Sequence, residues 1–314
     1  MNDMTDARSI AHAIVAAHGP RFGRVAATPV DAIASEADDP VYSGARHACT
    51  ALGFIDIDAR CLASAWRAQT LRTGRFDAGQ WPETPADFGM RAFPLSTRAD
   101  AFAACPERLG LYAVLPDAQW VGRMARAGVP TVQLRFKSED TGAIAREVAA
   151  AVEVMRGTGA LLFINDHWQA AIDAGAYGVH LGQEDLDALA PEHLRRLHDA
   201  GLRLGVSTHG YAEMVRADAV SPSYIAMGAV YPTTLKRMPT APQGVARLAA
   251  YARLLRGYPR VAIGGVDAAR LPEVLATEVG SVAVVRALVA AQDPEATAAQ
   301  WMQPMRKSAE KRRL

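Results

Sequence analysis

Short apolar runs rich in β-branched residues recur at regular intervals from Leu109 onward. Segments with helical spacing separate them, such as residues 120–128 and 144–157. This alternation is typical of parallel strands buried on both faces. Several of the helical segments end at a glycine just before the next run, namely at Gly128, Gly159, Gly175 and Gly201. The eight runs occupy residues 109–116, 131–137, 160–166, 177–182, 202–209, 223–232, 260–266 and 280–288.

Eight strand–helix units in residues 107–314 favour an α/β fold, a closed (β/α)8 TIM barrel. A doubly wound open sheet is the competing architecture. Residues 1–106 lack this rhythm and show helical patterns at 6–19 and 57–74. We therefore expect a mainly helical N-terminal extension of unknown role, packed on the barrel and dispensable for its chemistry.

Composition excludes several classes of function. The 34 basic and 33 acidic residues give a formal charge of +1, so no general attraction to nucleic acid or membranes is expected. The sequence contains no apolar window of about 18 residues and no signal peptide, so we expect no membrane span. Three cysteines without a CxxC motif indicate reduced thiols in a cytoplasmic protein. A homo-oligomer is left open.

Polar residues cluster where the second run ends. Gln133, Arg135 and Lys137 alternate, so in a continuous strand they point the same way, into the barrel mouth. A strand flanked by helices has no solvated face. Three inward polar residues therefore need an anionic or polar partner.

The third and fourth runs are each followed by carboxylates. Asp166 and Asp185 are 19 residues apart, which is about one strand–helix repeat, so they are expected on neighbouring strand ends. Oxygen ligands without a Cys/His set favour Mg²⁺ over Zn²⁺. Each aspartate alone could instead cap a helix. Together with the basic cluster, the pair predicts a Mg²⁺–diphosphate site, whereas His180 is at least as well explained as a core histidine.

The later runs predict a second anion site. Ser207 ends the fifth run, and the long loop after the sixth carries Lys236 among hydroxyl residues. Gly265 follows the seventh run and Arg286 the eighth, where barrels commonly bind a phosphate through backbone N–H groups. Two small phosphorylated substrates meeting over one mouth would fit both sites.

The motifs "VQLRFK", "FINDHWQAAIDAGAYGVHLGQEDL", "LGVSTH", "GAVYPTTLKRMPTAPQG" and "VAIGGV" resemble the thiamine phosphate synthase family. The resemblance covers residues of about 109–303 and does not reach 1–106. It implies a transferase that joins 4-amino-2-methyl-5-(diphosphooxymethyl)pyrimidine to 4-methyl-5-(2-phosphooxyethyl)thiazole. The products are thiamine phosphate and diphosphate, and Mg²⁺ is the implied cofactor.

The resemblance also implies roles for individual residues. Asp166 and Asp185 would be the Mg²⁺ ligands, and the catalytic residues would be Arg135, Lys137, Lys236 and Ser207. The pyrimidine diphosphate contacts would be Gln133, Leu134, Arg135, Phe136, Lys137, Asn165, Ser207 and Lys236. The thiazole phosphate contacts would be Thr233, Thr234, Leu235, Gly265, Val285 and Arg286.

Two positions depart from the family pattern. The family usually has a hydroxyl residue where Leu235 stands and a serine where Arg286 stands. We expect altered affinity for the thiazole phosphate rather than loss of activity. The alternatives are a thiazole tautomerase-like paralogue and a non-catalytic sensor of thiamine precursors.

Overall fold

The computed structural model describes residues 6–25, 38–233 and 240–310. The chain divides into two compact units. One unit comprises Met1–Ala92 together with Gly210–Ala219, and the other comprises Phe93–His209 together with Val220–Leu314. All eight described strands belong to the second unit, which therefore determines the fold class.

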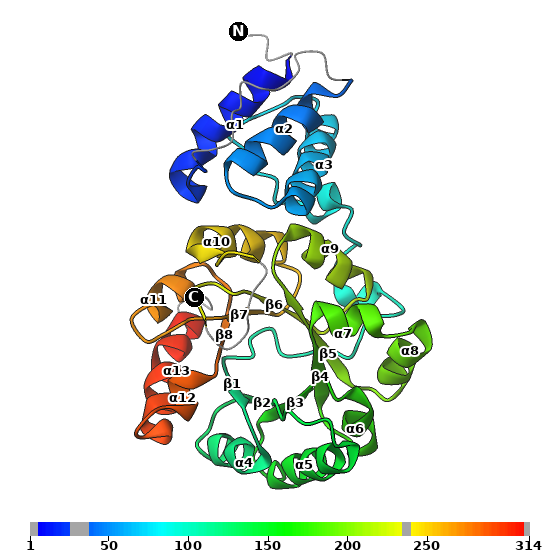
Figure 1. Ribbon diagram of the computed structural model, residues 1–314, viewed down its shortest axis with the longest axis vertical. Coiled ribbons are helices and arrows are strands. Elements are labelled where there is room, and N and C mark those ends of the chain that lie inside the picture. The colour runs from blue at the N-terminus through cyan, green and yellow to red at the C-terminus, as the bar shows by residue number, and fades with distance from the viewer. Residues whose placement is uncertain (1–5, 26–37, 234–239, 311–314) are drawn as a thin grey trace. The chain divides into compact units, whose positions relative to one another are not determined.

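The strands of the second unit close into one parallel barrel, as the apolar runs predict (Figure 1). Each strand pairs with the next along the chain, and β8 pairs with β1, which excludes the open sheet. Most strand residues are buried, because side chains fill the interior and helices cover the outside. The strands are β1 Leu111–Leu115, β2 Thr131–Leu134, β3 Leu161–Asn165, β4 Gly178–Leu181, β5 Arg203–Thr208, β6 Tyr224–Met227, β7 Arg260–Ile263 and β8 Ser281–Val284.

Local chemistry sets the helix ends in this unit. The Asp117 carboxylate accepts a hydrogen bond from the backbone N–H of Trp120 at 2.8 Å and so begins α4. The four glycines expected before strands all adopt positive φ angles, between 65° and 83°. The helices are η3 Leu95–Thr97, α4 Ala118–Arg126, α5 Thr141–Val154, α6 Trp168–Asp173, α7 Gln183–Ala188, α8 Pro191–Asp199, α10 Gly244–Leu254, α11 Leu271–Ala276, α12 Arg286–Val289 and α13 Pro294–Glu310.

The first unit is helical in its described residues. The helices expected near residues 6–19 and 57–74 are present as α1 and α3, whereas the sequence pattern does not predict α2. Gly44 lets α2 approach α1 closely, because a Cβ there would lie 2.5 Å from the carbonyl oxygen of Ala7. The helices are α1 Ala7–Phe22, α2 Pro40–Ala51, α3 Asp56–Thr73, η2 Pro85–Phe88 and α9 Tyr211–Ala219.

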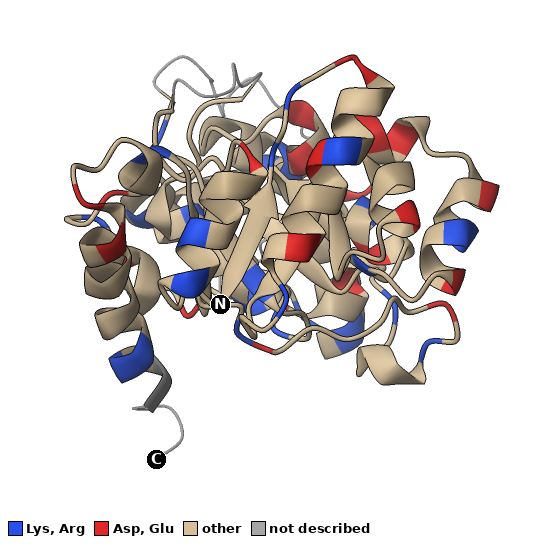
Figure 2. Cartoon of the chain, turned by 90° about the horizontal axis from the view of Figure 1, so that it is seen from below, with Lys and Arg blue, Asp and Glu red and all other residues tan. Residues whose placement is uncertain are grey.

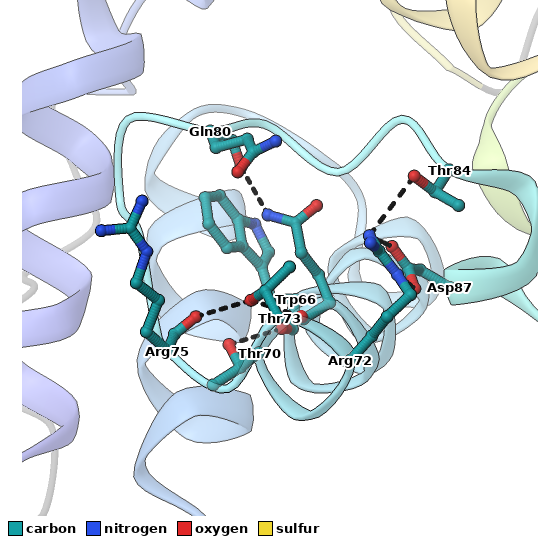
Figure 3. A network of polar contacts seen from close by, with 9 residues as sticks. Trp66, Thr70, Arg72, Thr73, Arg75, Gln80, Thr84 and Asp87 are labelled. Atoms are coloured by element: carbon teal, nitrogen blue, oxygen red, sulfur yellow. Dashed lines mark hydrogen bonds and ion pairs between the residues drawn. The ribbon is translucent and has the colours of Figure 1, made fainter.

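The segment after α3 is fixed to that helix by polar contacts (Figure 3). Arg72 binds the buried carboxylate of Asp87 through two nitrogens, at 2.8 and 2.6 Å. The Gln69 amide donates to the carbonyl oxygen of Gln80 at 2.8 Å. Over its described residues, the segment has no regular ladder of backbone hydrogen bonds to α3. The paired guanidinium and carboxylate fix its position instead.

Helix α9 belongs to the first unit although it lies between β5 and β6 in the chain. Tyr211 accepts a hydrogen bond from Trp81 Nε1 at 2.9 Å. At its two ends, the Ala212 N–H donates to Asp58 at 2.9 Å, and Asp218 accepts from the Arg91 N–H at 2.8 Å. The core of the first unit thus includes α9, a helix that lies between two barrel strands in the sequence.

Residues 93–106 belong to the second unit, so the boundary in the structure precedes the one expected after residue 106. The Phe102 N–H donates to the Ser221 carbonyl oxygen at 3.1 Å, and Ser223 Oγ donates to the Ala103 carbonyl oxygen at 2.7 Å. The sequence pattern does not separate this segment from the extension, because its Pro-rich stretch shows no strand or helix period.

Acidic and basic residues are interspersed over the helices (Figure 2). Within the described ranges, no helix has both the length and the apolar content needed to cross a membrane. The three cysteines are free thiols, and burial raises the pKa of Cys61 and Cys105 to about 12.

Candidate active site

The ends of β3 and β4 bring together the residues expected to hold a cation. Asn165 is the last residue of β3 and pairs in register with His180 on β4. Asp166 follows directly, and its N–H donates to the His180 carbonyl oxygen at 3.0 Å. Asp185 lies in the first turn of α7, where its carboxylate accepts from the Gly182 N–H at 3.1 Å. Parallel strands thus place both aspartates at one end of the barrel.

The two carboxylates interact directly. Loss of hydration raises the pKa of Asp166 to about 6, repulsion from Asp185 adds to this, and Arg135 partly opposes it. Asp166 is nevertheless open to solvent, so a cation can reach it. The residue also has a left-handed φ of 63°, a conformation that aspartate tolerates better than most side chains and that clusters at functional sites.

The described residues contain no group of three or more His, Cys, Asp or Glu side chains that could hold a metal ion. The Asp166–Asp185 pair can therefore supply only part of a coordination shell. Mg²⁺ commonly keeps several waters and takes one or two carboxylates plus substrate phosphates. The pair, with its mutual repulsion and exposed oxygens, fits that kind of shared site.

Strand β2 is shorter than its sequence suggests. It ends at Leu134, which is buried, and only the Arg135 N–H extends the ladder, donating to the Leu115 carbonyl oxygen at 2.7 Å. The alternation from Gln133 to Lys137 therefore does not continue as a strand. Gln133 is buried in the barrel, Arg135 is half-buried, and Lys137 is exposed.

The loop after β2 is tied to the loop after β3. The ring of His167 makes a hydrogen bond of 2.9 Å from Nε2 to the carbonyl oxygen of Phe136. His167 follows Asp166 directly, so one contact links the basic segment to the carboxylate pair. Sequence reasoning did not single out His167, because no spacing rule connects these two loops.

Ser207, near the end of β5, lies beside His180. The two are joined by a hydrogen bond of 2.8 Å between Nε2 and Oγ, and the Gln183 amide donates to the Ser207 carbonyl oxygen at 2.7 Å. His180 bonds through its other ring nitrogen to Tyr224 at 2.7 Å, and burial lowers its pKa to about 4. His180 is thus buried with a partner at each ring nitrogen, as expected for a core histidine.

The turns after β6 and β7 pack closely at the predicted phosphate site. The Val230 N–H donates to the Ile263 carbonyl oxygen, and the Tyr231 N–H to that of Gly264, both at 3.0 Å. Gly265 has φ of 67°, and a Cβ there would lie 2.6 Å from the Pro232 carbonyl oxygen. Only glycine fits this contact without a shift.

The remaining predicted phosphate contacts lie near these turns in the sequence. Thr233 is half-buried, Val285 precedes α12, and Arg286 is exposed as the first residue of that helix. Thr234, Leu235 and Lys236 lie outside the described residues. Sequence reasoning missed Arg270, whose guanidinium donates to the Gly265 carbonyl oxygen at 2.9 Å and so supports the turn.

A closed (β/α)8 barrel with a carboxylate pair, a nearby arginine and close-packed glycine turns at its strand ends is typical of enzymes that act on phosphorylated substrates. The sequence profile of the family described as thiamine monophosphate synthase matches residues 111–288. The chain belongs to this family and is an enzyme, as the sequence motifs indicate. The match lies within the barrel strands and the helices between them.

Individual relatives agree with this family. The chain is 54% identical over 188 residues to the thiamine-phosphate synthase of Neisseria meningitidis serogroup B, covering 60% of this chain and 90% of that protein. It is 50% identical over 202 residues to the enzyme of the same name from Serratia proteamaculans, covering 64% and 94%. The thiamine phosphate pyrophosphorylase structure from Pyrococcus furiosus superposes with a TM-score of 0.56 at 25% identity, covering 64% and 96%.

Proposed function

We propose that this chain joins 4-amino-2-methyl-5-(diphosphooxymethyl)pyrimidine to 4-methyl-5-(2-phosphooxyethyl)thiazole, giving thiamine phosphate and diphosphate. Membership of the family supports a transferase of thiamine biosynthesis. The observation that carries the proposal is the Asp166–Asp185 pair beside Arg135, since Arg135 acts electrostatically on Asp166. A site of this kind suits a diphosphate with its divalent cation.

Bond changes in this reaction are simple. The bond between the pyrimidine methylene carbon and the diphosphate oxygen breaks, and its electron pair leaves with diphosphate. The electron-rich aminopyrimidine supports the resulting cation, and the lone pair of the thiazole nitrogen then forms the new carbon–nitrogen bond. No protein nucleophile is required.

The residues of the chain act mainly by electrostatics. Asp166 and Asp185 would hold Mg²⁺, which neutralises charge on the departing diphosphate when bound. Arg135, Lys137 and Lys236 would add positive charge where negative charge grows. Gln133, Asn165 and Ser207 would bind the pyrimidine portion, together with the backbone of Leu134 and Phe136.

The thiazole phosphate would bind at the turns after β6, β7 and β8. Gly265 leaves space for close approach of a phosphate, and Val285 and Arg286 offer backbone N–H groups at the start of α12. Thr233, Thr234 and Leu235 would complete the contacts. The reacting groups would then meet over the barrel mouth.

The test is turnover by the purified full-length protein. With both substrates and Mg²⁺, we expect thiamine phosphate and diphosphate in equal amounts, and no product after chelation of the metal. Conversion of the thiazole phosphate alone would support the tautomerase-like alternative. Binding of either substrate without any product, at saturating Mg²⁺, would support a sensor and contradict the proposal.

A further inference from the structure

Five side chains inside the barrel form one continuous hydrogen-bond chain, here called the interior chain. Gln133 Nε2 donates to the Tyr112 hydroxyl at 3.1 Å, and that hydroxyl lies 2.7 Å from the hydroxyl of Tyr224. The Tyr224 hydroxyl lies 2.7 Å from His180 Nδ1, and His180 Nε2 lies 2.8 Å from Ser207 Oγ. The chain therefore runs across the barrel and joins two predicted pyrimidine contacts, Gln133 and Ser207.

The fold makes room for this arrangement. The side chains of Tyr112 and Tyr224 are fully enclosed, and their residues are 2% and 0% exposed. A Cβ at Gly205 would lie 2.1 Å from Cζ of Tyr224, so glycine on β5 is required for the ring to occupy its place. Phe163 packs against Tyr224 with ring centroids 5.1 Å apart. An apolar side chain could fill such a space without needing partners for a buried hydroxyl.

When Gln133 Nε2 faces Tyr112, one order of donors gives every proton between Gln133 and Ser207 an acceptor within the interior chain. An amide nitrogen only donates, so the Tyr112 hydroxyl accepts from it. The proton of this buried hydroxyl then needs an acceptor, which the Tyr224 hydroxyl provides. The Tyr224 hydroxyl then donates to His180 Nδ1. A neutral imidazole that accepts at one nitrogen donates at the other, so Nε2–H donates to Ser207. The proton of Ser207 is left to point elsewhere.

We propose that Tyr112, Tyr224 and His180 are positioning residues that fix the polarity of the two pyrimidine contacts. They hold Ser207 as a hydrogen-bond donor and leave the carbonyl oxygen of Gln133 as an acceptor. An aminopyrimidine has the complementary pattern, because its ring nitrogens accept hydrogen bonds and its exocyclic amino group donates them. This inference rests on the proposed function for the identity of the substrate, but not for the order of the interior chain.

The first test concerns the substrate-free full-length protein and needs no turnover. Nitrogen-15 NMR of the histidine rings should show His180 as a neutral imidazole with its proton on Nε2, its signal being identified by its loss in His180→Gln. Tyr224→Phe removes the donor to Nδ1 and should abolish the preference for that tautomer. A proton on Nδ1 in the unsubstituted protein, or no change in Tyr224→Phe, overturns the proposal whatever the enzyme does.

The second test is a comparison of kinetic constants. Tyr224→Phe and Tyr112→Phe should each lower kcat/KM for the pyrimidine diphosphate by about tenfold, because a buried hydrogen-bonding group is left without its partner. The KM for the thiazole phosphate should stay unchanged, since neither tyrosine hydroxyl contacts the turns after β7 and β8. Two variants are used so that a folding defect in one does not decide the outcome.

Tyr258→Phe is the matched control. Tyr258 is buried in the same unit, and its hydroxyl accepts from Arg98 at 2.9 Å, outside the interior chain. It should lose comparable thermal stability while both kinetic constants stay unchanged. Unchanged constants in both Tyr112→Phe and Tyr224→Phe, or an equal loss in Tyr258→Phe, would overturn the positioning role. If the NMR result is as predicted but the protein makes no thiamine phosphate, only the proposed function is rejected.

Discussion

Asp166, directly after β3, lies close to Asp185 in the first turn of α7, and lost hydration together with the proximity of Asp185 raises the pKa of Asp166 to about 6. Two carboxylates so placed repel one another when both are ionised. We expect this repulsion to lower the stability of the cation-free protein and to favour binding of a divalent cation. Removal of one carboxylate is therefore expected to weaken binding of the cation and to stabilise the cation-free protein.

Asp166→Asn should lower turnover by at least about a hundredfold, because it removes one of the two carboxylates proposed to bind the leaving-group metal. Asparagine tolerates a left-handed φ, so the backbone at this position should be preserved. Steady-state kinetics at saturating Mg²⁺ would measure the effect, with Asp185→Asn expected to behave similarly. Asp187→Asn changes the charge of α7 equally and should leave turnover near that of the unsubstituted enzyme. Near-normal rates in both ligand variants would refute the metal assignment.

The same Asp166→Asn variant should be slightly more stable than the unsubstituted protein when no metal is present. The folded-state pKa of Asp166 is about 6, above its ordinary value of 3.8, so the folded protein loses stability as pH rises from 3.8 through about 6. The gain on substitution should be about 1 kcal/mol or less, since the group is solvent-exposed. Thermal unfolding should show the difference above pH 6 and its disappearance toward pH 4. A gain that grows as pH falls would contradict the assignment.

Residues 93–314 expressed alone should unfold at a lower temperature than the full chain. Tyr211 on α9 is 0% exposed and loses Trp81 and Phe88 as neighbours, at a cost of about 3 kcal/mol. Tyr211→Ser should improve the solubility of this shortened chain but destabilise the full one, which calorimetry can measure. Equal melting temperatures for the full and shortened chains would show that the N-terminal helices contribute nothing to α9.

The barrel was predictable because its signals are local and repeated. An apolar run of strand length marks each unit, and a glycine precedes four of the runs. The structure has strands at all eight runs and positive φ angles at these four glycines. The end of β2 was not predictable, because the alternating Gln133, Arg135 and Lys137 mimic a longer strand. The grouping of α9 with the N-terminal helices depends on contacts between residues more than a hundred positions apart in the sequence. Hydrophobic periodicity reports only local structure and cannot predict such contacts.

The sequence predicted the site residues that follow the strands but not the buried tyrosines within the barrel. Asp166 and Asp185 were found because polar residues at strand ends stand out against apolar runs. Tyr112 and Tyr224 did not stand out, since each fits the apolar pattern of its strand while its hydroxyl serves a partner on another strand. Hydrophobic periodicity treats tyrosine as an apolar residue and cannot reveal such pairs.

Gly265→Ala should impair binding at the proposed thiazole phosphate site more than it impairs folding. A Cβ at this position meets the Pro232 carbonyl oxygen at 2.6 Å, so the turns after β6 and β7 must separate. The KM for the thiazole phosphate should rise at least about tenfold, while that for the pyrimidine diphosphate stays near normal. Gly128→Ala is the control, because Gly128 has φ of 83° and a Cβ there would meet no atom within 4 Å, so the substitution adds only backbone strain. Equal kinetic constants in both variants would contradict a phosphate site at Gly265.

Arg286→Ser tests whether the side chain at the start of α12 contacts the thiazole phosphate. Arg286 is exposed and is the first residue of α12, two residues after the end of β8. A charge-assisted contact predicts that the thiazole phosphate KM rises about tenfold on substitution, equivalent to about 1.4 kcal/mol. Arg286→Lys keeps the charge and should lose less. If both constants stay unchanged in Arg286→Ser, only the backbone N–H contact remains credible. A larger change for the pyrimidine diphosphate than for the thiazole phosphate would overturn the placement of the two anion sites, because Arg286 would then serve the diphosphate.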